Sequence, residues 1–423
     1  MSTFSLHESR LLGERYYAAE HESGLPIFVF PKKMTTTYAI FAVKYGGADN
    51  LTENGSFVFP EGTAHFLEHK LFDNEDGTDS LARFAAFGAD ANAYTASNRT
   101  AYLFSCSDHF AENLGELLDF VTHPYFTPAS VAKEQGIIAE EIRMCRDDPY
   151  DRCARNMLTG LYHSHPVRGD ICGTEASVAS ITDKILYNAY RTYYRLSNMA
   201  LVVCGDVTPS EVLAVADAHL KTADRTPAPA RERFPEPPTV RSPRTAVKGQ
   251  VAKPLFTIGV KDTAVPDDPQ ASMRRDAAME ILTELLFADT GELYNRLFDE
   301  GLISPGFSAG YTVTRDFGFL RISGEADDPE RVFSEIRAYL EKALKAGFTD
   351  EAVEHCRRVV FADYIKGFDS TEEIADDLVA FLFEGVDIFD YPGAIESVTK
   401  EELEALARGL FRPELFTLST VSP

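Results

Sequence analysis

A chain of 423 residues with a hydrophobic content of 44% can build more than one core, which suggests two or three domains. Its net charge of −25 disfavours binding to nucleic acid and to anionic membranes. No apolar run reaches the length of a membrane span, and residues 1–20 lack the apolar segment of a secretory signal. The six cysteines include no C-x-x-C pair, so we expect reduced thiols and a cytoplasmic protein.

The first informative elements are a strand and a helix. Residues 37–45 are rich in β-branched and aromatic side chains, which predicts a strand. Residues 65–69 read H-x-x-E-H, an inversion of the H-E-x-x-H zinc signature. On a helix, His65 and His69 are four positions apart and leave the same face, with Glu68 beside them. Two imidazoles and a carboxylate in this arrangement indicate two ligands of a catalytic zinc ion and a general base.

The sequence around the motif favours this interpretation over a helix with two half-buried histidines and a surface carboxylate. The helix has an apolar face of its own, formed by Phe66, Leu67, Leu71 and Phe72. The histidines are therefore not needed to fill the core. Thr63 is a candidate N-cap for this helix.

A third zinc ligand is expected on a second helix. Apolar residues recur at helical spacing through residues 131–144. Glu134 and Glu141 are seven positions apart, so both carboxylates border the same apolar stripe. An inward-facing carboxylate is unfavourable unless it is paired or bound to a metal. The spacing alone is equally consistent with a solvated acidic face that includes Glu140.

Taken together, these motifs resemble the pitrilysin/insulysin-type zinc metallopeptidases, the inverted-motif family that includes mitochondrial processing peptidase. That family combines H-x-x-E-H with a distant E-(x)6-E pair on a second helix. The resemblance implies that Glu141 is the third ligand, beside His65 and His69, of one zinc ion per chain. It also implies that Glu68 is the catalytic base and that Glu134 is a supporting catalytic acid.

The resemblance covers residues 20–210. Residues 87–95 resemble the family's edge strand after the zinc helix. A peptide substrate is therefore expected to add as a strand along four residues, Ala91, Asn92, Ala93 and Tyr94.

An internal repeat predicts the domain organisation. Three pairs of segments, separated by 215 to 222 residues, align with one another: 65–72 with 280–287, 126–131 with 348–353, and 180–202 with 397–420. We expect a zinc-binding catalytic half over residues 1–221 and a homologous half over residues 251–423. Residues 222–250 between them are rich in proline and predict a stiff linker.

The second half lacks the zinc-binding histidines. Glu280, Thr283 and Glu284 occupy the positions of the H-x-x-E-H residues, and Asp363 occupies that of Glu141. These carboxylates could hold a hard cation or could be ordinary surface acids. We expect zinc only in the first half.

Strands and helices are interspersed in both halves. The predicted strands are 37–45, 101–106, 199–204, 255–260 and 318–323, and the further predicted helices are 112–121, 185–194, 271–287 and 332–344. This mixture indicates an α+β fold in which each half is a mostly antiparallel sheet with helices on one face. The resemblance implies that the two halves form half of a clamshell.

One departure from the family bears on partners. In active members, the second half supplies an arginine and, seven residues later, a tyrosine that hold the substrate carbonyl. Phe298 stands where the arginine is expected, and Arg296 and Tyr311 are the alternatives. The departure implies that a zinc-less homologous subunit completes the site in a heterodimer. A homodimer is the alternative.

The expected activity is that of a zinc-dependent endopeptidase that hydrolyses short or unfolded peptides, including peptide precursors, with Glu68 as general base. The alternative is a non-catalytic or weakly active structural or assembly subunit of a larger complex. An intact set of four motif residues favours the enzyme, since a purely structural subunit needs no general base. Neither nucleic acid nor a membrane is an expected partner.

Overall fold

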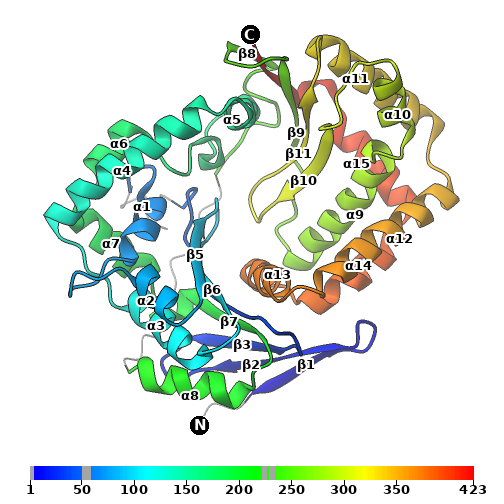
Figure 1. Cartoon of the computed structure of the whole chain (residues 1–423). Coiled ribbons are helices and arrows are strands. Elements are labelled where there is room, and N and C mark those ends of the chain that lie inside the picture. The colour runs from blue at the N-terminus through cyan, green and yellow to red at the C-terminus, as the bar shows by residue number, and fades with distance from the viewer. Residues whose placement is uncertain (1–3, 50–58, 222–225, 228–233) are drawn as a thin grey trace. The chain divides into compact units, whose positions relative to one another are not determined.

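The structure, a computed structural model, describes residues 4–49, 59–221, 226–227 and 234–423 (Figure 1). It is an α+β protein with two sheets, and the strands and helices predicted from the sequence are all present. Two compact units are formed, and neither is one continuous stretch of chain. The first comprises Met1–Ile142, Gly169–Glu232 and Ile365–Phe383, and the second comprises Arg143–Arg168, Arg233–Tyr364 and Glu384–Pro423. The expected halves were residues 1–221 and 251–423. Arg143–Arg168, from the expected first half, belongs to the second unit, and Ile365–Phe383, from the expected second half, belongs to the first.

The first unit contains a seven-stranded sheet in the order β1-β2-β3-β7-β4-β6-β5. All neighbouring strands pair antiparallel except β3 and β7, which are parallel. The strands are β1 (Ser5–Ser9), β2 (Glu14–Glu20), β3 (Pro26–Pro31), β4 (Thr37–Val43), β5 (Asp90–Thr95), β6 (Thr100–Cys106) and β7 (Met199–Gly205). The helices are α1 (Thr63–Leu71), α2 (Ser80–Ala86), α3 (Phe110–Thr122), α4 (Pro128–Asp147, whose last turn enters the second unit), α6 (Glu175–Ser180), α7 (Asp183–Tyr193), α8 (Pro209–His219) and α13 (Thr371–Glu384), with the 3₁₀ helix η2 (Leu196–Asn198).

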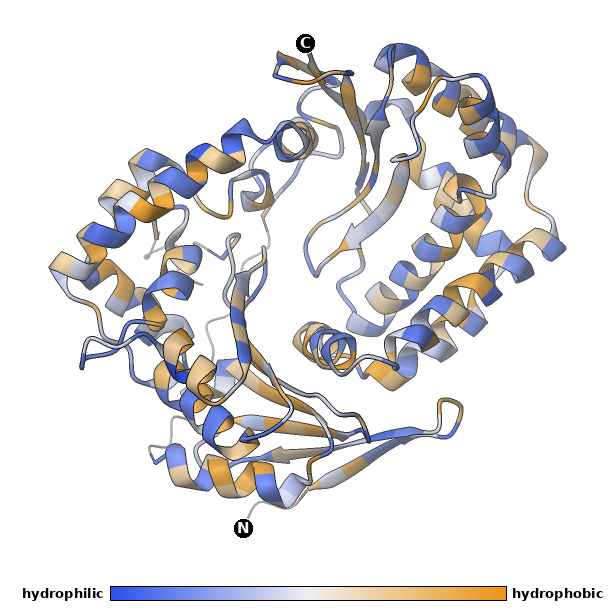
Figure 2. Ribbon diagram, viewed as in Figure 1, coloured by the Kyte–Doolittle hydropathy of each residue, from blue (hydrophilic) through white to orange (hydrophobic). Residues whose placement is uncertain are grey.

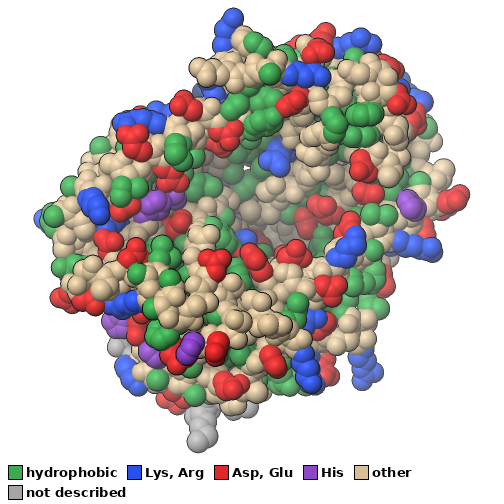
Figure 3. Space-filling view, in the orientation of Figure 1, with side chains coloured by type: hydrophobic (Ala, Val, Ile, Leu, Met, Phe, Trp, Pro, Cys, Tyr) green, Lys and Arg blue, Asp and Glu red, His purple; other side chains and the backbone are tan. Residues whose placement is uncertain are grey.

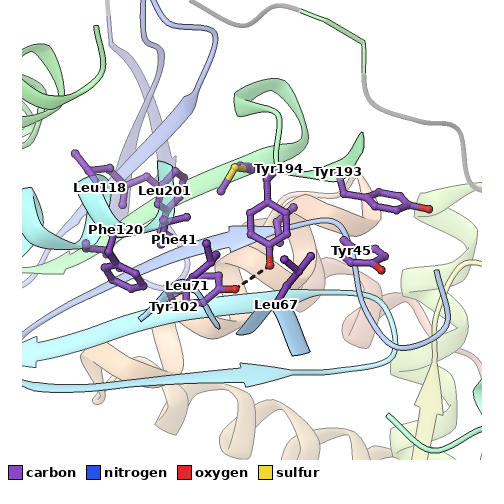
Figure 4. Close-up of a cluster of buried hydrophobic side chains, with 14 of the residues drawn as sticks. Phe41, Tyr45, Leu67, Leu71, Tyr102, Leu118, Phe120, Tyr193, Tyr194 and Leu201 are labelled. Carbon is purple, nitrogen blue, oxygen red and sulfur yellow. Dashed lines mark hydrogen bonds between the residues drawn. The ribbon is translucent and has the colours of Figure 1, made fainter. Parts of the chain in front are cut away.

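The apolar side of α1 packs into the core between the sheet and the helices (Figure 4). Leu67 and Leu71 lie among side chains of the central strands, including Phe41 of β4. Tyr102 of β6 and Tyr194 keep their buried hydroxyls paired with each other at 2.8 Å. Burial of each large apolar side chain contributes about 1.5–3 kcal/mol, so α1 is held rigidly by the face opposite its histidines.

Helix α13, from the C-terminal part of the sequence, packs on the other face of this sheet. Asp376 of α13 accepts hydrogen bonds from the hydroxyls of Tyr38 in β4, at 3.1 Å, and Tyr94 in β5, at 2.6 Å. Phe368, just before α13, packs against Phe30 of β3. All seven residues of β4 are buried, as a strand covered on both faces requires.

The second unit contains a five-stranded sheet in the order β10-β11-β9-β12-β8, in which only β12 and β8 pair in parallel. The strands are β8 (Arg244–Lys248), β9 (Leu255–Asp262), β10 (Ser308–Val313), β11 (Gly318–Glu325) and β12 (Phe416–Ser422). The helices are α5 (Pro149–Leu161), α9 (Pro269–Phe287), α10 (Glu292–Asp299), α11 (Pro329–Ala346), α12 (Asp350–Gly367), α14 (Tyr391–Ser397) and α15 (Lys400–Leu410), with the 3₁₀ helices η1 (Pro166–Arg168), η3 (Ile388–Asp390) and η4 (Pro413–Leu415).

The exchanged helix α5 packs on β9 and β12 of this second sheet. Gly259 makes the contact close, because a Cβ there would lie 2.5 Å from the sulfur of Met157. Strand β8 lies inside the range expected to be linker, residues 222–250. Residues 222–225 and 228–233 of that range are outside the described residues.

Elements of the same type recur at the repeated segments: α1 and α9, α4 and α12, α7 and α15, β7 and β12. Apolar residues line the strands and the inner sides of the helices in both units (Figure 2). Acidic and basic side chains are interspersed over the visible surface (Figure 3). Among the described residues, none of the helices combines the length and the apolarity needed to cross a membrane.

Candidate active site and metal centre

The motif helix α1 begins at Thr63, and its N-cap is Gly62. The expectation that Thr63 would be the N-cap is therefore wrong. Gly62 adopts a left-handed backbone with φ of 87°, and the hydroxyl of Thr63 instead donates to the carbonyl of Pro60 at 2.6 Å. A Cβ on Gly62 would lie 2.5 Å from the carbonyl oxygen of Cys172, so glycine is required there.

Three predicted ligands converge from α1 and α4. The Nε2 atoms of His65 and His69 are 3.2 Å apart. One oxygen of Glu141 is 3.5 Å from His65 Nε2, and the other is 3.4 Å from His69 Nε2. Zinc bonds of about 2.0–2.2 Å place the donors of a tetrahedral site roughly 3.3–3.6 Å apart. The residues present therefore fit a zinc ion.

Glu134 is not one of these three donors but contacts the other ring nitrogen of His69. Its Oε1 is 3.0 Å from His69 Nδ1, and its Oε2 is 3.8 Å from the ammonium group of the buried Lys70. A carboxylate can only accept at Nδ1, so in the neutral ring Nδ1 carries the proton and the Nε2 lone pair faces His65 and Glu141. This arrangement selects the tautomer that a metal at Nε2 needs.

The charges around His69 change its titration. Burial lowers the pKa of His69, but the hydrogen bond to Glu134 and the charges of Glu68 and Glu141 outweigh it, so the pKa is raised. Burial raises the pKa of Glu134, but the hydrogen bond to His69 and the charge of Lys70 bring it below its ordinary value. The carboxylate of Glu134 is therefore ionised at neutral pH.

Glu68 lies beside the last residue of the edge strand β5. Its Oε2 accepts a hydrogen bond from the hydroxyl of Thr95, the last residue of β5, at 2.6 Å. Thr95 was not identified from the sequence. The signal was the alternation along β5, because Ala91 and Ala93 face the core and Thr95 shares their face.

The four expected substrate-binding residues, Ala91 to Tyr94, lie in β5, at the end of the strand order. β5 pairs antiparallel with β6, and no described strand pairs with its other edge. Asn92 and Tyr94 point to the sheet face opposite the core, where Tyr94 meets Asp376. The backbone of this edge is available for an added strand.

The two candidates for the carbonyl clamp have partners within the second unit. The guanidinium of Arg296 pairs with Glu335 at 2.6 Å. The buried hydroxyl of Tyr311 donates to Asp262 at 2.6 Å, and Asp262 also pairs with Arg275. Both side chains are therefore already engaged by other residues of the protein in this structure.

The counterpart of the zinc site in the second unit is a pocket of about 300 Å³. Glu280, Thr283, Glu284 and Asp363 line it. Burial and the nearby carboxylates of Asp276 and Glu284 raise the pKa of Glu280 to about 7. The aligned residues are thus brought together, but without an imidazole lining the pocket among the described residues.

Comparison with known proteins gives a consistent result. Residues 59–175 match the family profile described as insulinase (peptidase family M16), and residues 180–360 match the profile described as peptidase M16 inactive domain. An uncharacterized zinc protease of Bacillus subtilis (strain 168), YmfH, is 35% identical over 425 residues, which cover 98% of each chain. The crystal structure of a putative M16-like peptidase from Alicyclobacillus acidocaldarius superposes with a TM-score of 0.91 at 33% identity, covering 99% of this chain and 98% of that one. Pitrilysin shares the fold, with a TM-score of 0.77 at 16% identity, and this chain covers 47% of it.

Proposed function

The chain belongs to the insulinase family of peptidases (peptidase family M16), and we propose that it is a zinc-dependent endopeptidase acting on short or unfolded peptides. The observation that carries the proposal is the donor set of His65, His69 and Glu141, whose mutual distances of 3.2 to 3.5 Å suit one zinc ion per chain. When bound, zinc supplies a Lewis acid that lowers the pKa of water and polarises a carbonyl. The zinc protease relatives support the same metal.

In this proposal, two further glutamates beside the metal ligands have separate roles in proton transfer and in positioning. Glu68 is the general base, which accepts a proton from the attacking water and passes it to the leaving amine. Its hydrogen bond to Thr95 holds the carboxylate at the end of β5, where a bound peptide would lie. Glu134 is a positioning residue, because it acts through the ring of His69.

The substrate class follows from the edge strand. A peptide that adds to β5 bonds through its main chain, so affinity depends little on its sequence. Only an extended segment can pair in this way, which favours short or unfolded peptides over folded proteins. Processing of peptide precursors is one such role.

The role of base is tested by Glu68→Gln. This variant keeps the three metal-holding residues, so we expect wild-type zinc content together with a fall in kcat of at least about 100-fold, the lower end of what general-base catalysis contributes. Glu140→Gln, an exposed position on α4, is the matched control and should keep both properties. The proposed role fails if Glu68→Gln retains substantial kcat on a mixed peptide library.

A partner subunit and a location complete the proposal. Phe298 replaces the expected arginine, and both Arg296 and Tyr311 are engaged elsewhere, so the carbonyl clamp would come from a second, zinc-less homologue. The coverage of only 47% of pitrilysin supports a second chain, with a homodimer as the alternative. If no such complex is active, a structural or assembly role becomes the better interpretation. All six cysteines lie in the described residues and none forms a disulfide, which supports the cytoplasm as the location that we propose.

A further inference from the structure

Cys172 lies beside the donor set, although no sequence motif points to it. Its sulfur is 4.0 Å from His65 Nε2. Donor atoms of Cys172, His65 and Glu141 all lie within 4.8 Å of one another. A zinc–sulfur bond of about 2.3 Å beside a zinc–nitrogen bond of about 2.0–2.1 Å places the two donors roughly 3.6 Å apart in a tetrahedral site. The observed separation of the Cys172 sulfur and His65 Nε2 therefore exceeds the separation of two zinc ligands by only a few tenths of an ångström.

The backbone holds the thiol in this place. Gly62 and Gly173 both adopt positive φ, 87° and 78°, and lie against each other's segments. A Cβ on Gly173 would lie 2.5 Å from the carbonyl oxygen of Glu61, and one on Gly62 would lie 2.5 Å from that of Cys172. The amides of Cys172 and Gly173 donate to Asp170, at 3.0 and 2.9 Å. The loop is thus fixed against the start of α1, one turn before His65.

We propose that Cys172 is a fourth protein ligand of the metal in the peptide-free protein. The inference rests on the proposed zinc centre and adds a resting state to it. Zinc sites with four protein ligands are of the structural, closed type, whereas catalytic sites keep one position open. On binding, the thiol loses its proton to solvent, and the sulfur takes the position that water needs for hydrolysis.

Cys172 is also the ligand that can leave. His65 and His69 are carried by α1, and Glu141 by the long helix α4. Cys172 lies in the loop between η1 and α6. Because the loop backbone is fixed, the thiolate leaves by rotation of the Cys172 side chain alone, which opens the site while the other three ligands keep the metal.

Cobalt substitution tests this directly on the full chain. Cobalt(II) bound through a thiolate shows a near-ultraviolet sulfur-to-metal charge-transfer band, and the visible bands of the four-coordinate ion appear with or without a thiolate among its ligands. We expect the charge-transfer band in the wild type and in Cys145→Ser, whose partly buried thiol lies elsewhere on α4. Cys172→Ser should lose that band and keep the visible ones.

The other outcomes separate the two proposals. Visible bands without a charge-transfer band in the wild type would overturn the role of Cys172 and leave the metal centre intact. A charge-transfer band that persists in Cys172→Ser would also overturn it. If neither kind of band appears, the metal centre itself is wrong.

A second readout is independent of spectroscopy. Loss of a thiolate ligand should weaken zinc binding, measured by competition with a chelator, by at least about tenfold, as loss of even an outer partner does. The zinc-loaded Cys172→Ser variant should hydrolyse peptide at least as fast as the wild type, because the position for water is no longer contested. Unchanged affinity, or slower hydrolysis by the loaded variant, would contradict the proposal.

Discussion

His69 contacts a carboxylate through each of its ring nitrogens, and this supports the different roles that we propose for the two glutamates of α4. Glu141 meets Nε2 at 3.4 Å, and Glu134 meets Nδ1 at 3.0 Å. Their spacing of seven residues places both on one face of α4, with the same ring between them. The sequence spacing predicted that Glu134 and Glu141 share one face of a helix. It could not exclude that this face is solvated, because only the tertiary structure brings α1 against α4.

At the same scale, Glu280 lines a pocket of the second unit whose described lining residues include no histidine, and its ionisation is predicted to lower the free energy of unfolding. Burial and neighbouring carboxylates raise its pKa from 4.5 to about 7. A carboxyl group with a raised pKa in the folded state contributes stability that is complete below pH 4.5 and is lost as pH rises through 7. Glu280→Gln removes this loss. Between pH 5.5 and pH 8 its advantage over the wild type in free energy of unfolding should grow by about 1–2 kcal/mol, allowing for partial exposure.

Denaturant unfolding at the two pH values measures this growth. Glu351→Gln, at an exposed position on α12, is the control and should differ from the wild type equally at both. A constant difference for Glu280→Gln as well would show that its carboxyl group titrates normally.

At the scale of elements, local pattern predicted the helices and strands, and long-range packing decided where two of them lie. The β-branched and aromatic composition of residues 37–45 and the helical period of residues 131–144 are local features, and they correctly predicted β4 and α4. The packing of α13 on the first sheet joins Asp376 to Tyr94 across 282 residues, which leaves no periodic trace in either segment. The Gly62–Gly173 contact that places Cys172 likewise joins segments far apart in the sequence.

We predict that helix α13 holds the edge strand β5 in place. Asp376 accepts from two tyrosines, and burial together with Asp376 raises the pKa of Tyr94 to about 12 although Arg99 opposes the shift. Asp376→Asn removes the charged acceptor, so we expect a loss of about 1–3 kcal/mol in free energy of unfolding. Because β5 is then less ordered, KM for peptides should rise more than kcat falls.

Zinc content should not change in Asp376→Asn, since no metal-holding residue is touched. Asp369→Asn, an exposed position just before α13, is the control and should match the wild type in KM and stability. An unchanged KM in a destabilised Asp376→Asn protein would mean that α13 supports the sheet without positioning the substrate edge.

At the scale of the whole molecule, the chain carries one set of proposed zinc ligands, and both candidates for the family's arginine–tyrosine pair, Arg296 and Tyr311, are engaged within the second unit. We expect weak peptidase activity from the isolated chain and a large gain on adding a zinc-less homologue from the same organism, because a second chain would orient the carbonyl and exclude water. The heterodimer should bury more than about 1,000 Å².

Light scattering after size exclusion and a fluorogenic peptide assay measure both properties. Adding the same homologue to the Glu68→Gln chain is the control and should give a complex without activity. A homodimer that cleaves peptides as fast as the mixture would exclude the heterodimer.

The central claim is that His65, His69 and Glu141 hold one zinc ion, and the metal content of purified variants tests it most directly. We predict one zinc per chain in the wild type and in Glu140→Gln, and loss of zinc in Glu141→Gln and His69→Ala. Full zinc affinity in Glu141→Gln, or loss of zinc in Glu140→Gln, would contradict the assignment of the third ligand and with it the proposed site.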